Sequence, residues 1–141
     1  MRVLLFTTMT LWTCSLFAAS NRQTYRDAQG RNMGSASTDS SGRTTYRDSM
    51  GRNQGSATVS GNRTTYRDSM GRNQGSATTD RSGNTTYRDA QGRLMGTART
   101  DSSGRVTYRD AQGRLQGTAT TDSSGRTTYR DAQGRLQGTK K

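Results

Sequence analysis

Polar residues dominate this chain after residue 20, and the few apolar residues recur at regular intervals. Each of the six Tyr residues follows the previous one by 20 or 21 positions. Around every Tyr lies a short run rich in β-forming residues, such as RTTYR at 43–47. Apolar residues do not recur with the period of about 3.6 that marks an amphipathic helix. The pattern therefore predicts strand, turn, strand, turn in series, which is a chain of β-hairpins.

Two kinds of turn signal, both of the form Asp-x-x-Gly, separate the predicted strands. The first follows Tyr-Arg, as in DAQG at 131–134, and the second has the form DSSG, as at 122–125. An Asp at the start of such a turn accepts hydrogen bonds from backbone N–H groups, and Gly at the fourth position adopts the left-handed conformation. In TVSGNR at 58–63 the Asp and one residue are missing, which produces the single interval of 20. Only the second turn therefore tolerates a deletion.

The odd length of the repeat constrains which way the side chains face. Side chains alternate between the faces of a strand, so a shift of 21 residues reverses them unless one turn changes the parity. We expect the first turn to be a four-residue loop and the second a three-residue loop with a Gly bulge, because the opposite choice mixes Tyr with Arg and Gln. One face then carries Tyr108, Leu115, Gly117, Ala119, Thr121 and Tyr129, and the other carries Arg109, Arg114, Gln116, Thr118 and Arg130.

The predicted fold is all-β, with six tandem repeats of about 21 residues over 21–141 that form a single-layer antiparallel meander or a solenoid-like sheet. This region has 24 apolar residues, most of them small, and no Ile, Phe or Trp, so it cannot build a conventional core. Composition alone is typical of disorder. One alternative to the predicted fold is therefore a chain that stays disordered until it meets its partner. We expect stacked Tyr side chains to pack the sheet: Tyr25, Tyr46, Tyr66, Tyr87, Tyr108 and Tyr129.

Residues 1–20 have a different composition, with one Arg, an apolar run and small residues at the end. This layout is typical of a cleaved secretory signal peptide, and the apolar run is short and interrupted for the rival interpretation, a membrane-spanning helix. The single cysteine, Cys14, excludes a disulfide framework within the chain. A lipoprotein anchor at Cys14 is disfavoured because bulky Trp12 precedes it closely. We predict a secreted, periplasmic or cell-surface protein.

The residue types argue against catalysis. His and Glu are absent, and all ten acidic residues are Asp. General acid–base chemistry near neutral pH ordinarily needs His or a tuned carboxylate, and no base is available to activate a Ser. Each turn supplies one carboxylate, whereas Ca²⁺ needs several on one loop. We therefore expect no enzyme activity, no small-molecule substrate, no metal site and no cofactor.

Basic residues give the strongest functional signal. The chain has 22 Lys and Arg residues but only 10 acidic residues, so its net charge is +12. An Arg ladder on one face would engage phosphates or sulfates along nucleic acid, lipopolysaccharide or an acidic polysaccharide. The competing explanation is that Arg merely keeps a thin sheet soluble. The candidate polyanion-binding residues are Arg26, Arg31, Arg47, Arg52, Arg67, Arg72, Arg88, Arg93, Arg109, Arg114, Arg130 and Arg135.

A second functional hypothesis is self-assembly. An open single-layer sheet has two unpaired edges, and each invites pairing with another copy of the chain. The leading interpretation is a secreted, non-enzymatic structural or adhesive surface component that assembles edge to edge. The alternative is a cationic module that binds an anionic polymer or surface. Higher salt separates them, because it weakens polyanion binding and favours assembly.

The repeat resembles the YD repeat of Rhs proteins. The segment DAQGRL at 131–136, together with a DSSGRTTY segment such as 122–129, is similar to that family's pattern of Tyr, Asp-x-x-Gly-Arg-Leu and a second Gly turn. Here Arg130 separates Tyr from Asp, whereas in the family Tyr directly precedes Asp. The resemblance covers nearly all of 24–139, implies spiralling sheets of β-hairpins and favours a bacterial source. A weaker resemblance to MORN repeats implies single-layer hairpin sheets, and neither resemblance implies a function.

Overall fold

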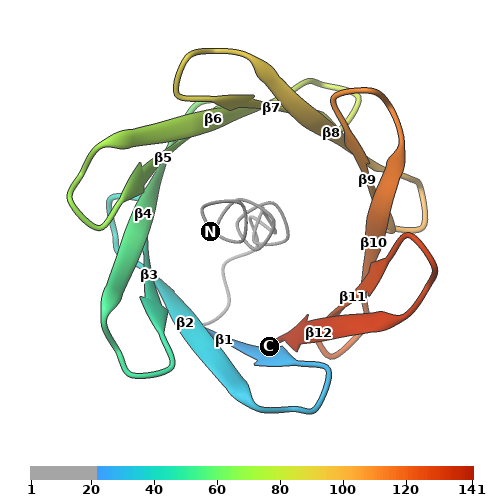
Figure 1. The fold of residues 1–141 in the computed structure, drawn as a ribbon, viewed down its shortest axis with the longest axis horizontal. Coiled ribbons are helices and arrows are strands. Elements are labelled where there is room, and N and C mark those ends of the chain that lie inside the picture. The colour runs from blue at the N-terminus through green and yellow to red at the C-terminus, as the bar shows by residue number, and fades with distance from the viewer. Residues whose placement is uncertain (1–21) are drawn as a thin grey trace.

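The computed structural model describes residues 22–141, and in this range the chain forms twelve β-strands and no helix. The predicted signal peptide and Cys14 lie outside the described residues. The strands are β1 (Arg22–Asp27), β2 (Asn32–Thr38), β3 (Arg43–Asp48), β4 (Asn53–Ser60), β5 (Arg63–Asp68), β6 (Asn73–Thr79), β7 (Asn84–Asp89), β8 (Leu94–Thr100), β9 (Val106–Asp110), β10 (Leu115–Thr121), β11 (Thr127–Asp131) and β12 (Leu136–Lys140). Each strand is antiparallel to the next, and β12 pairs with β1, so the sheet closes into a barrel (Figure 1).

Closure of the sheet corrects part of the predicted fold. The all-β class and the hairpin repeats are confirmed, but the open meander is wrong. The closing pair has the register of an ordinary junction between repeats: Lys140 lies opposite Tyr25, as Ala119 lies opposite Tyr129. Six equivalent hairpins therefore complete a ring, and the closed sheet leaves no unpaired edge among the described strands.

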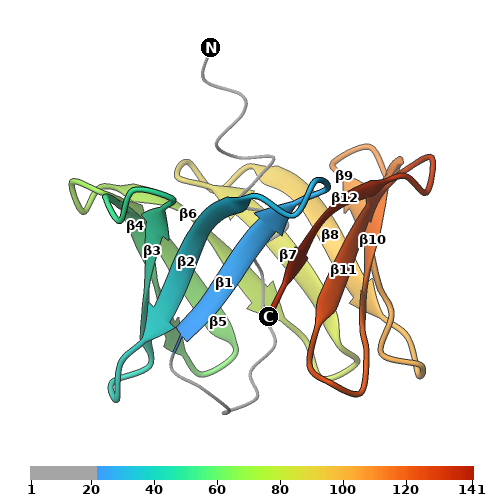
Figure 2. The ribbon, with the colours of Figure 1, turned by 90° about the horizontal axis from the view of Figure 1, so that it is seen from below.

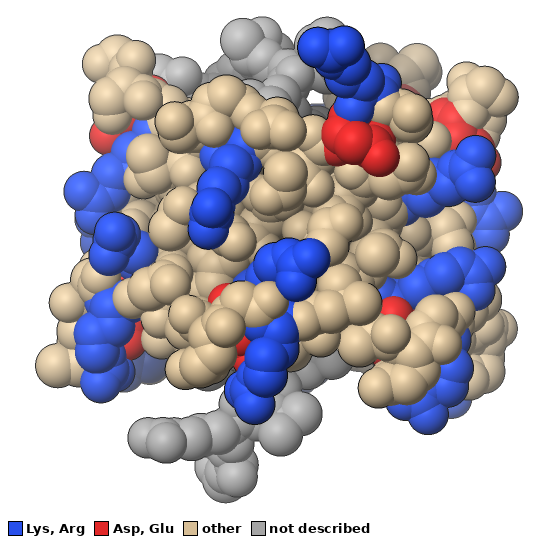
Figure 3. Space-filling model, turned by 90° about the horizontal axis from the view of Figure 1, so that it is seen from above, with Lys and Arg blue, Asp and Glu red and all other residues tan. Residues whose placement is uncertain are grey.

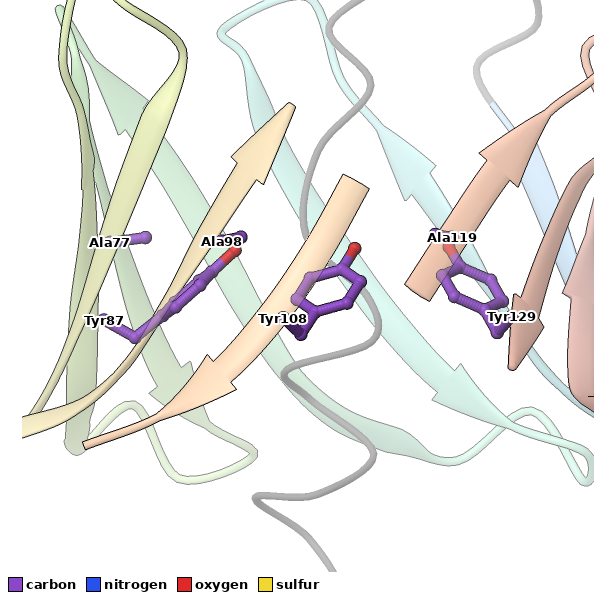
Figure 4. Packing of buried hydrophobic residues seen from close by; sticks show 6 residues of the cluster. All are labelled: Ala77, Tyr87, Ala98, Tyr108, Ala119 and Tyr129. Carbon is purple, nitrogen blue, oxygen red and sulfur yellow. The ribbon is translucent and has the colours of Figure 1, made fainter. Parts of the chain in front are cut away.

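The inner face of the barrel is lined by Tyr and Ala. Each Tyr in an odd-numbered strand has a Gly opposite it on one side and, at every junction but the closing one, an Ala on the other. Tyr108, for example, lies between Gly117 and Ala98. All the Tyr side chains are buried except that of Tyr66, which is half-buried. Figure 4 shows three of these Tyr side chains, Tyr87, Tyr108 and Tyr129, in succession around the barrel, with Ala residues of the same cluster among them. Tyr and Ala thus form a thin lining in place of a conventional core.

The Tyr hydroxyl groups influence one another across this interior. Burial raises the pKa of Tyr25 and Tyr129 above the usual range, and electrostatic repulsion from Tyr46 adds to the rise in both. Tyr46 lies on β3 and Tyr129 on β11, which are not adjacent in the sheet. They belong to two clusters of buried Tyr and Ala side chains, one with Tyr25 and Tyr46 and the other with Tyr87, Tyr108 and Tyr129, and Tyr66 packs against both.

Both kinds of turn have the same geometry, contrary to the prediction of two loop lengths. In the first kind, the Gly51 N–H donates to the Asp48 carbonyl (3.0 Å), and the Asp48 N–H donates to the Arg52 carbonyl (3.0 Å). The DSSG turn at 39–42 has the same two hydrogen bonds, of 3.1 and 2.9 Å. Each is a tight turn that ends on a left-handed Gly. The loops therefore do not account for the odd repeat.

The parity changes instead at a β-bulge in each even-numbered strand. Tyr46 lies opposite Gly55, but the next residue, Arg47, lies opposite Asn53, so Gln54 is the extra residue. A bulge adds one residue to one strand and bends it. Tyr and Ala therefore share a face, as predicted, but a different device places them there.

The bulge also corrects the predicted position of Leu115. The alternation of side chains places Leu115 on the face of Tyr108, but the register shifts between Leu115 and Gly117. Leu115 lies opposite Arg109 and is 39% exposed. Its side chain is therefore available at the surface instead of lining the barrel.

The deletion at 58–63 shortens one turn without disturbing the wall. Ser60 pairs directly with Arg63, so Gly61 and Asn62 form a two-residue loop in which Gly61 has a φ of 58°. The residues that follow keep the register of the other repeats. The second turn therefore absorbs the change in length locally.

The Gly beside each bulge is required by a close backbone contact. A Cβ atom on Gly75 would overlap the carbonyl oxygen of Arg88 on the neighbouring strand, and the φ of Gly75 is 136°. The turn residue Gly71 has a φ of 83° but open space around its Cβ position. These two residues therefore separate the effect of backbone conformation from the effect of crowding.

We predict that Gly75→Ala destabilises the barrel more than Gly71→Ala does. The turn substitution carries only the strain of a left-handed Ala, about 1–2 kcal/mol. Gly75→Ala adds a clash that the wall must relieve, which lowers the free energy of unfolding by about 1–3 kcal/mol more. Denaturant unfolding followed by circular dichroism measures both values. Equal losses in the two variants would show that the bulge does not need its Gly.

Candidate anion-binding rim

Six equivalent turns lie together at one end of the barrel. Because successive strands run in opposite directions, every turn from an odd-numbered to an even-numbered strand lies at the same end (Figure 2). These hairpins splay outwards around the ring (Figure 1). We call each a corner and the end that carries them the corner rim. The corners are residues 26–33, 47–54, 67–74, 88–95, 109–116 and 130–137.

A single Asp organises each corner. In the second corner, one oxygen of Asp48 accepts hydrogen bonds from the backbone N–H groups of Met50 and Arg52, both at 2.9 Å. The other oxygen accepts a hydrogen bond from Nε of Arg52 at 2.7 Å. The same ion pair recurs in all six corners at 2.6–2.8 Å. The hydrogen bond from the Arg52 side chain holds the pKa of Asp48 below its usual range, although partial desolvation opposes it.

The second Arg of each corner is fixed by the backbone. Nη1 of Arg47 donates to the carbonyl oxygen of Gly51 at 3.0 Å, and the equivalent bond in every other corner is 2.8–2.9 Å. The side chain of the other Arg, Arg52, is 69% exposed. Each corner thus presents two oriented guanidinium groups and one carboxylate. Its net charge is 2 − 1 = +1, so the six corners together carry +6.

The structure brings the twelve predicted Arg residues to one rim but does not form the continuous ladder that we expected. Each Arg in a turn bonds to the Asp of its own corner, and each Arg after a Tyr bonds to the Gly of its own corner. The arrangement is therefore six separate clusters around a ring. Figure 3 shows basic side chains over both ends of the wall, several beside acidic ones.

Each corner also carries an exposed apolar side chain, which the sequence reasoning missed. The large exposed apolar residues of 22–141 are Met33, Met50, Met70, Leu94, Met95, Leu115 and Leu136. All of them lie within the corners, and every corner has at least one. The missed signal was the recurrence of one Met or Leu within each corner at changing positions.

The turns at the opposite end differ in chemistry. In the turn at 39–42, Asp39 accepts a hydrogen bond from the Ser41 hydroxyl at 2.6 Å instead of an ion pair from Arg. That hydrogen bond, with the one from the Arg43 N–H, lowers the pKa of Asp39. No large apolar side chain is exposed in the described turns of this end. The corner rim is therefore the more distinctive end of the barrel.

A metal-holding cluster and a membrane-spanning helix are both absent from the described part of the chain. Across 22–141, no three His, Cys, Asp or Glu side chains come together in a way that could hold a metal ion. The same residues contain no helix with the length and hydropathy needed to cross a membrane. Every buried side-chain nitrogen or oxygen atom within them has a hydrogen-bond partner.

Residues 88–127 match the family model described as RHS Repeat. This match confirms the predicted resemblance to YD repeats. A YD repeat is a repeat module and is generally not catalytic. Among solved structures, the chain is similar to BamB from Moraxella catarrhalis, with 12% identity and a TM-score of 0.30 over 77% of this chain. The match spans only 54% of the BamB chain, and a likeness this weak implies no function. No curated protein matches the chain.

We predict that acid destabilises the barrel through its Asp residues. All ten have a lowered pKa in the folded state, because hydrogen bonds from the turn and from Arg, Ser or Asn side chains outweigh partial burial. The unfolded chain takes up protons first, near pH of about 3.9, so this stabilisation is present above that pH and is lost as the pH falls through the folded-state values. Thermal unfolding at a series of pH values measures the loss.

The matched control replaces the carboxylates of the corners. A variant with Asn at positions 27, 48, 68, 89, 110 and 131 keeps a side-chain oxygen for the turn but has nothing to protonate there. It should be less stable than the wild type at neutral pH and should lose less stability below pH of about 4. A wild-type unfolding midpoint that stays constant through this range would contradict the prediction.

Proposed function

We propose that this protein is a non-enzymatic YD-repeat barrel that binds anionic polymers or anionic surfaces through the corner rim. The observation that carries the proposal is the repeated geometry of the corners. Six equivalent clusters present twelve oriented guanidinium groups around one rim, with a net charge of +6. Arg is the side chain best suited to phosphate and sulfate, because its planar fork donates two parallel hydrogen bonds.

Preorganisation supports this function over mere solubility. A solubilising Arg needs no defined orientation, whereas each corner Arg is held by a hydrogen bond to its own turn. Immobilising a flexible side chain on binding costs about 0.5–1.5 kcal/mol, and the corner has already met part of that cost in folding. The Asp accepts a hydrogen bond from Nε of one Arg in its corner, and the side chain of that Arg remains 69–77% exposed, so it can still contact an anion.

Multivalency strengthens the weak affinity of one corner. A single exposed Arg pair binds an anion poorly in water, but six linked sites act together on a polymer that reaches several of them. Nucleic acid, lipopolysaccharide and acidic polysaccharides all repeat their charges in this way. The corner rim is therefore suited to an extended anionic partner more than to a single small ion.

We predict that replacing the Arg after each Tyr weakens DNA binding. The variant has Gln at positions 26, 47, 67, 88, 109 and 130, which keeps a side-chain N–H donor but removes six charges. Binding to a labelled DNA duplex, followed by fluorescence anisotropy at several salt concentrations, should weaken about tenfold or more and show a shallower dependence on salt.

The matched control removes the same charge outside the corners. It has Gln at positions 43, 63, 81, 99, 105 and 126 and should stay within about threefold of the wild type. Equal weakening of the two variants would mean that net charge alone, and not the corner geometry, accounts for binding. Circular dichroism verifies that both variants keep the barrel.

A structural or adhesive surface role, with secretion directed by residues 1–20, is the second candidate. The observation that favours it is that β1 and β12 are the one pair of neighbouring described strands that no turn connects. Their ladder has three paired positions and continues with two backbone hydrogen bonds between Thr24 and Lys141, of 2.8 and 3.1 Å. Opening at this seam would expose two edges in the register of an ordinary junction, and a second copy could then pair with them.

We predict that closing the seam covalently prevents this assembly. The linker Thr-Asp-Ser-Ser-Gly between Lys141 and Arg22 reproduces the five residues that join Thr120 to Arg126. Sedimentation velocity should show association of the linear residues 22–141 at high salt, where charge repulsion is screened, and a monomer for the cyclised chain. Assembly of both forms to the same extent would exclude the seam as its route.

A further inference from the structure

The corner rim combines positive charge with exposed apolar surface. Met50 and Met70, at the tips of their turns, are 70% and 76% exposed. Their neighbours in the corners are the exposed Arg side chains described above. An anionic polymer in water accounts for the Arg residues but leaves the apolar side chains without a role.

None of these apolar residues belongs to the Tyr and Ala lining of the barrel, and the five besides Met50 and Met70 are 38–46% exposed, so each is partly covered by its surroundings. They occupy three different positions of the repeat: the turn tip at Met50, the start of an even strand at Leu94, and the bulge at Met33. The Tyr residues that line the barrel keep one fixed position in every repeat. A side chain that packs the wall needs a fixed place in the register, whereas an exposed side chain at the rim needs only to protrude. What the corners share is thus an apolar group facing outwards.

The distribution of these groups also separates the two ends of the barrel. Every corner has at least one exposed Met or Leu, while the described turns of the opposite end have none. The corners are related by the repeat and lie at the same level of one ring (Figure 2). The rim therefore presents six points, each cationic and apolar, toward a single surface.

We propose that the corner rim docks on a lipid bilayer whose headgroups are anionic phosphates; this inference rests on the proposed function and names its partner. The Arg side chains pair with the lipid phosphates, and the Met and Leu side chains enter the boundary between headgroups and acyl chains. Binding to such an interface scales with the apolar area buried and with the attraction of basic residues to anionic lipids. Met adapts to an irregular surface because it is unbranched and flexible. Charge complementarity selects this partner over a neutral bilayer.

The repeats themselves supply a conservative way to remove the apolar groups. Each substitution takes the residue that another repeat carries at the same position, and the charge stays unchanged. The apolar variant is Met33→Gln, Met50→Gln, Met70→Gln, Leu94→Asn, Met95→Gln, Leu115→Asn and Leu136→Asn. The matched control, Val59→Thr with Val106→Thr, also follows other repeats but changes residues outside the corners.

The test measures the full chain against two probes. One is flotation with vesicles of phosphatidylcholine containing phosphatidylglycerol, with pure phosphatidylcholine vesicles for comparison, and the other is the DNA duplex used above. We expect the wild type to prefer the anionic vesicles by about tenfold or more. The apolar variant should lose about tenfold in affinity for those vesicles while binding DNA within about twofold of the wild type. The Val control should match the wild type with both probes.

Several results would overturn the inference and leave the proposed function standing. These are a wild type that binds DNA but not the anionic vesicles, or an apolar variant that binds the vesicles as well as the wild type. Equal binding to the neutral vesicles would remove the anionic headgroup from the inference. Equal loss of vesicle and DNA binding in the folded apolar variant would also contradict it. By contrast, unchanged binding of both probes by the corner Arg variant would overturn the proposed function itself.

Discussion

Backbone pairing around a closed ring is the constraint on which this structure depends. A chain with so few large apolar side chains cannot be held by a deep core, and its Tyr and Ala residues form only a thin lining. Closure gives every described strand two hydrogen-bonded neighbours, including the pair of β1 with β12. An open sheet of the same repeats would leave two strands half-paired. The ring therefore supplies through backbone hydrogen bonds the order that a larger domain obtains from burial.

Local chemistry was readable from the sequence because it is contained within a few residues. Asp48 and Gly51 define a turn whatever surrounds them, and the repeat predicted that Tyr and Ala share a face, although a bulge places them there. Ring closure was not readable, because it depends on how the twist and stagger of all six hairpins accumulate. The bulge had a signal that we attributed to the loops: an isolated Gly inside a strand, such as Gly55, commonly marks a bulge.

The same distinction applies to the corner rim. The Arg positions followed directly from the repeat, but their division into separate clusters depends on the hydrogen bonds of each Asp with its own turn. The apolar residues were missed because strict alternation placed Leu115 inside the barrel, and the bulge turned it outwards. A single extra residue thus converted a lining position into a surface position, which alternation of side chains alone cannot reveal.

Each corner makes its side-chain hydrogen bonds almost entirely within its own eight residues, and this self-sufficiency has an evolutionary consequence. Gln29 and Met50 occupy the same position in two repeats. The strand pairs that carry them, β1 with β2 and β3 with β4, nevertheless have the same register. A lineage can therefore alter one contact point at a time, and duplication of a repeat would copy a finished contact point. The strands of the barrel keep their geometry while the side chains of the corner rim change.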